Sequence, residues 1–207
     1  MDVDIERLKY FQEELSKQLV LKDKLDKDKI RTIAGCYTSF KDNNLICAIV
    51  TLGYKTLNII EEKVSTLKST MDHIPGYSSF RYGPVFLKVY RMLKQKPDIL
   101  MFNGNGILHP QKIGIASHMG ILFNIITIGV AKSLLLGEIK ENMVFVDDEQ
   151  RAVKINENSD PLYVSPGHNI CLETSVEIVR YCLKENKLPE PIRLALNLAD
   201  KHKKDIA

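Results

Sequence analysis

The sequence lacks long apolar runs, closely paired cysteines and a strong excess of either charge. Its longest apolar stretch, residues 121–136, is interrupted by polar side chains, whereas a membrane helix needs roughly 20 apolar residues. The 44% hydrophobic and 27% charged fractions are ordinary for a globular protein and exclude wholesale disorder and collagen-like sequence. Residues 2–7 are mostly charged, which is unlike a secretory signal. We therefore expect no membrane segment and a cytoplasmic location.

The four cysteines form no CxxC pair. This spacing argues against a zinc site and against a disulfide scaffold, and it favours reduced, buried thiols in a cytosolic protein. The net charge of +3 and pI near 8.5 permit a nucleic-acid partner but fall short of the strongly basic surface that would argue for one.

The 207 residues predict a single α/β domain, with an N-terminal helix within residues 1–28 and a core over 29–200. Apolar spacing predicts that this first helix spans residues 4–28. The other expected helices span 86–95, 113–123, 173–184 and 191–203. The expected strands span 31–37, 45–53, 54–64, 99–102, 125–130, 143–146, 152–155 and 162–165. This order of elements predicts a mixed β-sheet flanked by helices.

A polar, glycine-rich segment, residues 103–106, directly follows the continuous apolar strand 99–102. Ligands collect at the carboxyl ends of such strands, so the segment is either a ligand-facing loop or a turn that needs positive φ angles. It is not a phosphate-binding P-loop, because no GK[ST] follows. The acidic run 147–149 lies between two short strands and reads as a hairpin turn rather than a metal site.

Several basic side chains near strand ends are candidate ligand contacts. Lys132 follows a buried strand and is either a phosphate anchor or a solvent-facing lysine at a helix start. His109 and His168 also follow predicted strands, and each is either a ligand contact or a packed, structural histidine. No pair of carboxylates stands at the ends of the buried strands, although two-metal phosphodiester hydrolysis needs several converging carboxylates.

The chain resembles the endonuclease V family. The segment GILHPQKIGIASHMG (residues 106–120) and TIGVAK (127–132) are similar to its central motif. Residues 73–81 resemble its YIPG…FRE segment, and residues 165–174 and 188–193 resemble its C-terminal signatures. The resemblance implies a ribonuclease H-like fold and recognition of inosine or deoxyinosine in DNA or RNA. It also implies Mg²⁺-dependent cleavage of the second phosphodiester bond 3′ to the lesion, with the base flipped out of the stack.

The resemblance assigns site residues by position. Lys132 would face the scissile phosphate, and His109 and His168 stand where the family also has histidines. The segment that wedges into the gap left by the flipped base would be His73, Ile74, Pro75 and Gly76. The base pocket would involve Gly104, Gly114, Ile115 and Ala116.

The three acidic metal ligands of the family are replaced together. Their positions fall on Tyr37, Tyr82 and Asn103, and a histidine of the same motif falls on Asn105. Tyrosine and asparagine are neutral at ordinary pH, and Mg²⁺ is usually held with the help of carboxylates. We therefore expect no metal and no cofactor. The tyrosines either fill the vacated site or stack on bases.

Three functions remain open from the sequence. The first is a catalytically impaired or inactive endonuclease V homologue that binds deaminated or distorted DNA or RNA. The second is an active deoxyinosine 3′-endonuclease of DNA repair, with Mg²⁺ or Mn²⁺ in a weakened or relocated site. The third is a non-enzymatic interaction protein that reuses the fold, with the N-terminal helix as its docking element and an unknown protein partner.

Overall fold

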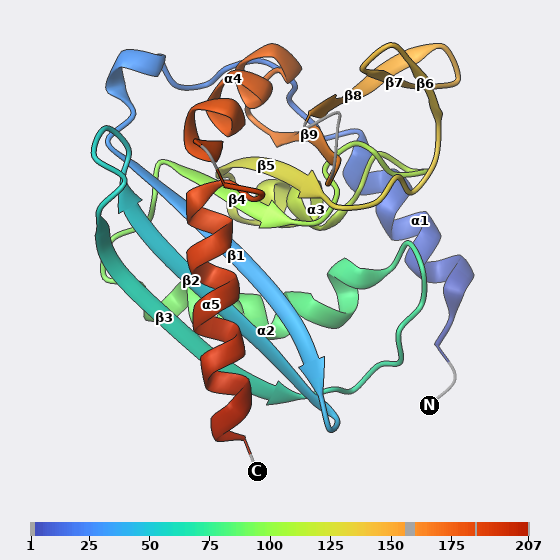
Figure 1. Ribbon diagram of the computed structural model, residues 1–207. Coiled ribbons are helices and arrows are strands. Elements are labelled where there is room, and N and C mark those ends of the chain that lie inside the picture. Colours follow the sequence, from blue (N-terminus) through green and yellow to red (C-terminus); the bar gives the residue numbers. More distant parts are fainter. Residues whose placement is uncertain (1–2, 156–159, 185, 207) are drawn as a thin grey trace.

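The computed structural model describes residues 3–155, 160–184 and 186–206 of the chain. Its described strands form one mixed sheet of nine strands with helices on both faces (Figure 1), as the order of elements predicts. The elements are α1 (Ile5–Ser16), a 3₁₀ turn (Lys27–Lys29), β1 (Thr32–Lys41), β2 (Asn44–Gly53), β3 (Ile59–Lys68), α2 (Ser78–Met92), β4 (Ile99–Asn103), α3 (Ile115–Phe123), β5 (Ile126–Ala131), β6 (Glu138–Lys140), β7 (Met143–Val146), β8 (Glu149–Ile155), β9 (Leu162–His168), α4 (Leu172–Leu183) and α5 (Glu190–Asp205).

The strand order is β3-β2-β1-β4-β5-β9-β8-β7-β6. The first three strands form an antiparallel meander, and the tight turn between β1 and β2 places Asp42 and Asn43 at positive φ. β1, β4 and β5 run parallel at the centre, and the carboxyl ends of β4 and β5 lie side by side. β9 runs antiparallel to β5 and begins the second half of the sheet. Because β1 continues to Lys41, Asn103 at the end of β4 lies between the middle of β1 and the end of β5.

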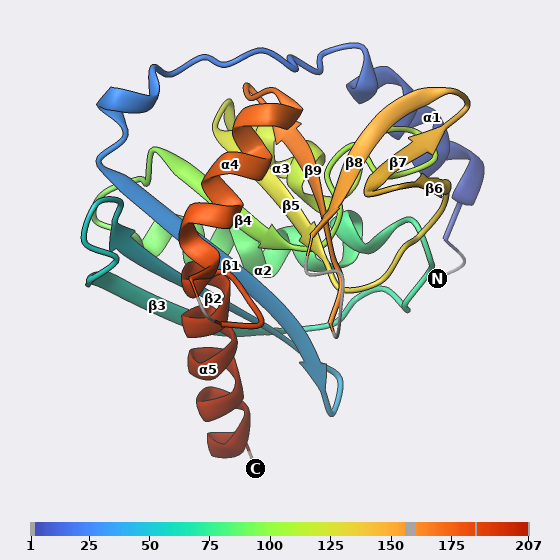
Figure 2. The same ribbon diagram turned by 45° about the horizontal axis from the view of Figure 1, so that its top comes forward.

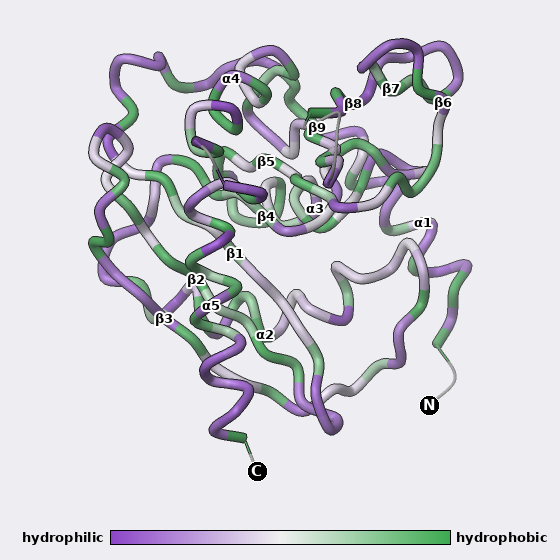
Figure 3. Tube along the Cα trace, viewed as in Figure 1, coloured by the Kyte–Doolittle hydropathy of each residue, from purple (hydrophilic) through white to green (hydrophobic). Residues whose placement is uncertain are grey.

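The helices cover opposite faces of the sheet (Figure 2). On one face, α4 and α5 pack over Ile33, Met101 and Ile128. On the other, α2 and α3 pack over Ala34 and Leu100. Adjacent residues of a strand point to opposite faces, so these central strands are apolar on both sides. The hydropathy trace shows the same arrangement, with hydrophobic residues along the central strands (Figure 3). In the described ranges, no helix is long and apolar enough to cross a membrane.

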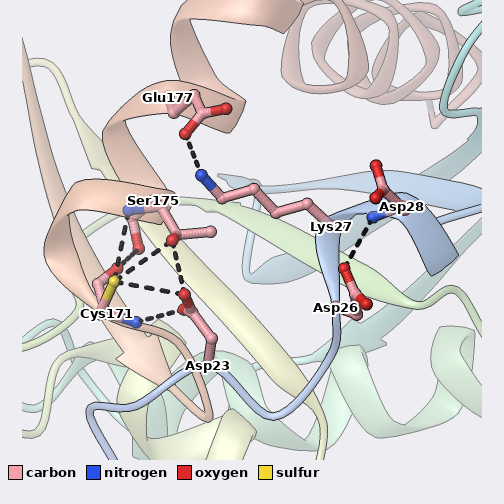
Figure 4. A network of polar contacts seen from close by, with 8 residues as sticks. Asp23, Asp26, Lys27, Asp28, Cys171, Ser175 and Glu177 are labelled. Carbon is pink, nitrogen blue, oxygen red and sulfur yellow. Dashed lines mark hydrogen bonds and ion pairs between the residues drawn. The ribbon is translucent and has the colours of Figure 1, made fainter.

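The expected helix over residues 4–28 is wrong beyond Ser16, where α1 ends. The following segment runs extended across the molecule because its side chains bind elsewhere. The Asp23 carboxylate accepts hydrogen bonds from the Cys171 backbone N–H (2.9 Å) and the Thr174 hydroxyl (2.6 Å) at the start of α4 (Figure 4). Burial opposes ionisation of Asp23, but these hydrogen bonds outweigh it and lower its pKa. Asp23 thereby ties the N-terminal segment to α4.

Other predicted bounds are also wrong. The strand expected over 31–37 continues to Lys41, so Tyr37 lies within β1 rather than at its end. The third strand is expected over 54–64, but β3 runs from Ile59 to Lys68 after a turn in which Leu57 has positive φ. α2 begins at Ser78 rather than at residue 86, so Pro84 lies inside the helix and not in its first turn. Gly83 precedes it, and a residue without Cβ reduces the clash that proline imposes on its predecessor. The short strand β6 was not predicted.

Candidate functional site

Tyr37 lies in the middle of β1, beside the carboxyl end of β4 that carries Asn103, and Lys132 directly follows the end of β5. Cys36 pairs with Phe102, so Tyr37 and Asn103 follow the last paired positions of adjacent strands. Asn103 in turn pairs with Val130, two residues before Lys132. Tyr37 packs partly against the α5 side of the sheet, and Lys132 is exposed. The structure thus places two of the three substituted positions on adjacent strands, with Lys132 just after the end of the next strand.

Tyr82 approaches this region from α2. Its phenol is close enough to Tyr37 to affect that group electrostatically, as is the Asp200 carboxylate on α5. Burial raises the pKa of Tyr37, and Asp200 and then Tyr82 add to the increase. Both tyrosines are half-buried. The Tyr37 hydroxyl is therefore neutral at physiological pH and can donate a hydrogen bond.

These residues do not fit a Mg²⁺ site. Magnesium demands octahedral oxygen coordination and is usually bound through one or two carboxylates. The three positions supply two phenols and an amide, and Asp200 is a single, exposed carboxylate on a different element. Among the residues the structure describes, no group of three or more His, Cys, Asp or Glu side chains could hold a metal ion. The donor chemistry favours neutral hydrogen bonding over metal ligation.

A shallow pocket of about 260 Å³ adjoins Lys132. An ion pair between Lys187 and Asp160, at 2.6 Å, lies at its wall. Its lining residues are Lys132, Asp160, Pro161, Leu162, Lys187 and Leu188. The pocket joins the Lys132 side of the site to the loop that precedes α5.

The four residues predicted to form a base pocket lie together where the loop after β4 meets the start of α3. The backbone N–H of Ala116 donates to the Asn105 carbonyl (3.1 Å), and that of Gly114 donates to the Gly106 carbonyl (3.0 Å). A Cβ at Gly114 would lie 2.2 Å from the Asn105 carbonyl oxygen, so only glycine fits there. A Cβ at Gly104 would lie 2.8 Å from the Ile115 side chain. The result is a tightly packed, backbone-rich region in which Gly104 is partly exposed, whereas Gly114, Ile115 and Ala116 are buried.

The predicted wedge is a loop with an exposed tip and an anchored base. His73 and Pro75 are exposed, whereas the Gly76 carbonyl accepts hydrogen bonds from two side chains, His109 Nε2 (2.7 Å) and Gln12 Nε2 (3.0 Å). Gly76 has φ +83°, a conformation that favours glycine. The tip can therefore contact a partner while its base stays fixed to the loop after β4 and to α1.

His109 acts as this anchor because its protonation state is fixed. Its Nδ1 accepts a hydrogen bond from the Gln111 N–H (3.3 Å). Nε2 therefore carries the proton and donates the hydrogen bond to the Gly76 carbonyl. Burial lowers the pKa of His109, Gly76 opposes the shift, and the charge of Arg151 reinforces it. The buried Arg151 also donates to the His109 carbonyl at 3.0 Å. Sequence reasoning missed Gln12 and Arg151, since nothing in an isolated Gln or Arg identifies a partner 64 or 42 residues away.

His168 lies away from the Lys132 edge. It pairs with Thr127 at the start of β5, five residues before Lys132, which is about 16 Å along a strand. Its Nδ1 accepts from the Val20 N–H (3.3 Å), and burial lowers its pKa, with a smaller contribution from Lys24. The structure does not bring His168 together with the other candidate residues, and a catalytic role for it stays a prediction.

The sequence profile of the endonuclease V family matches residues 13–197. An endonuclease V from Dictyoglomus turgidum is 40% identical over 194 residues, covering 89% of this chain and 84% of the relative. The crystal structure of Ciona intestinalis endonuclease V, in complex with DNA containing an inosine followed by a ribo-adenosine, superposes with a TM-score of 0.89 at 27% identity, covering 100% of both chains. The Streptomyces avermitilis endonuclease V structure has the same fold, with a TM-score of 0.91 at 23% identity over 99% of this chain and 95% of that one.

Proposed function

The chain belongs to the endonuclease V family, with its ribonuclease H-like fold, and we propose that it binds inosine-containing or distorted nucleic acid without efficiently cutting it. The observation that carries this proposal is the joint replacement of three expected metal ligands by Tyr37, Tyr82 and Asn103 around a retained Lys132. The DNA-bound Ciona relative supports a nucleic-acid partner.

Recognition would begin with the wedge loop. Flipping a base out of the stack costs a few kcal/mol, and least for a mispaired or unpaired base. The exposed side chains of His73 and Pro75 would occupy the gap in the stack. The hydrogen bonds of His109 and Gln12 to the Gly76 carbonyl would hold the loop in one conformation. A preorganised loop loses little conformational entropy on binding.

The flipped base would then meet the chain at Gly104, the partly exposed residue of this backbone-rich region. Glycines let the backbone approach a ligand closely, and backbone N–H and C=O groups can distinguish the edge of hypoxanthine from that of adenine. Lys132 would hold the phosphate on the 3′ side as a compact positive charge. These contacts account for binding and require no metal.

Cleavage would be impaired because activation of the attacking water is missing. Metal-dependent hydrolysis relies on bound cations that lower the pKa of water and stabilise the leaving oxygen. The phenols of Tyr37 and Tyr82 and the Asn103 amide are neutral and bind hard cations poorly. Lys132 can stabilise negative charge but supplies no hydroxide at neutral pH.

A binding comparison tests the proposal. Fluorescence anisotropy should be measured in Mg²⁺ with oligonucleotides that differ only by inosine or adenosine, as DNA and as RNA, single-stranded and duplex. We expect tighter binding to the inosine member of at least one pair. Ile74→Ala should reduce this preference, and Lys132→Ala should weaken binding to both members. Lys55→Ala, an exposed lysine at the opposite end of the sheet, is the matched control. Equal affinity for both members of every pair would contradict the proposal.

A further inference from the structure

We propose that the vacated metal site binds the phosphodiester backbone directly, through the Tyr37 and Tyr82 hydroxyls and the Asn103 amide, with Arg81 and Lys132 supplying positive charge. Nucleic-acid binding by this chain then needs no divalent cation. The inference rests on the proposed function and adds the chemistry by which that site holds its ligand.

The first support is the largely buried side chain of Arg81. The residue is 7% exposed, and among the described residues no carboxylate lies within ion-pair distance of it. Its polar contact is one long hydrogen bond to the Ser69 hydroxyl (3.4 Å). Buried charges in proteins are normally paired, so a cation with several free N–H donors points to an anionic ligand.

The second support is the position of Arg81. Its guanidinium carbon lies 4.2 Å from the centre of the Phe40 ring and 5.6 Å from that of Tyr82. These rings hold the guanidinium beside one of the three substituted positions, and cation–π contacts leave its N–H groups free to donate outward. Arg81 therefore adds a fixed positive charge on the α2 side of the site.

The third support is the change in charge at the site itself. Three carboxylates would repel a phosphate unless a cation neutralised them, whereas the neutral side chains here impose no such repulsion. At about 6 Å and the screening of bulk water, one carboxylate weakens the binding of a phosphate roughly threefold, and three weaken it about 30-fold. Lower screening near the protein surface would increase this factor.

The test compares affinity for an inosine oligonucleotide in excess EDTA and in Ca²⁺ at matched ionic strength. We expect the affinity of the natural chain to be the same in both. The triple variant Tyr37→Asp, Tyr82→Glu, Asn103→Asp should bind at least about tenfold more weakly in EDTA and recover in Ca²⁺. The matched control carries the same types of change at exposed sites away from this edge, Tyr10→Asp, Tyr181→Glu and Asn58→Asp, and should bind like the natural chain in both solutions.

A second variant isolates Arg81. Arg81→Met has a similar volume and removes a buried charge, so the thermal unfolding temperature should stay the same or rise while the affinity falls and the salt dependence of binding weakens. A lower unfolding temperature with unchanged affinity of the folded protein would show that Arg81 only supports the fold, and would overturn its assignment to the ligand.

The two proposals fail in distinguishable ways. If the natural chain binds no oligonucleotide in either solution, the proposed function is wrong. If it binds with a preference for inosine but only when a divalent cation is present, the proposed function stands and direct binding at the vacated site is overturned.

Discussion

Protonation of His118 is expected to destabilise the protein in mild acid. The side chain lies in α3, is 3% exposed, and contacts the Ser79 hydroxyl through Nδ1 at 2.9 Å. The ring of Phe80 meets it edge-on at 4.9 Å between centroids. Burial, with a smaller contribution from His109, lowers the pKa of His118 from 6.5 to about 4. A charged imidazole is therefore disfavoured where α3 meets the start of α2.

The size and sign of the effect follow from proton linkage. The unfolded chain binds this proton near pH 6.5 and the folded protein near pH 4, so stability is complete above the unfolded value and falls as the pH drops toward the folded one. The full difference is about 3 kcal/mol, of which about 2 kcal/mol is lost between pH 7 and pH 5. His109 and His168, whose pKa values are also lowered by burial, shift stability in the same direction.

Urea unfolding at pH 7, 6 and 5 measures this loss, with His118→Gln as the comparison. Glutamine keeps a hydrogen-bonding group for Ser79 but cannot titrate, so the variant should be less stable at pH 7 by about 1–2 kcal/mol and should lose about 2 kcal/mol less on acidification. An equal pH dependence in the two proteins would refute the assignment of the acid sensitivity to His118.

Three further predictions concern the wedge, the pocket and the start of the sheet. Gln12→Leu removes one of the two donors to the Gly76 carbonyl; it should cost about 1 kcal/mol of stability and reduce the preference for inosine in anisotropy, without changing non-specific affinity. Gly114→Ala places a Cβ 2.2 Å from the Asn105 carbonyl oxygen and should lower the free energy of unfolding, measured in urea, by about 3 kcal/mol. Asp98→Ala leaves the Arg31 and Thr32 N–H groups, each 2.9 Å from the carboxylate, without their acceptor and should lower thermal stability by about 2 kcal/mol.

The central strands and their ends were predictable because their signals are local. The apolar runs of β4 and β5 indicate two buried strands, and the polar Asn103–Gly106 segment indicates a loop after the first; the structure has both strands and pairs them in parallel. The turn at Asp42 and Asn43 likewise follows from side chains that tolerate positive φ.

The misassigned segments depend on contacts between distant residues. Residues 17–26 have a charge pattern compatible with a helix, but the bonds of Asp23 to the start of α4 require an extended chain. The anchoring of Gly76 by Gln12, 64 residues earlier in the chain, carries no sequence signal either. The residues that the resemblance assigns to the base pocket lie together in the structure, but the residues that support them carry no signal in the sequence.

A denaturing-gel cleavage assay tests the central claim most directly. Purified protein in excess is incubated with end-labelled DNA and RNA oligonucleotides that carry one inosine, in Mg²⁺ or Mn²⁺. Lys132→Ala, purified in parallel, controls for a contaminating nuclease, and the variant that restores Asp at positions 37 and 103 and Glu at position 82 tests whether the missing carboxylates limit activity. We predict no product from the natural chain. Cleavage one nucleotide beyond the inosine by the natural chain, abolished by Lys132→Ala, would contradict the account.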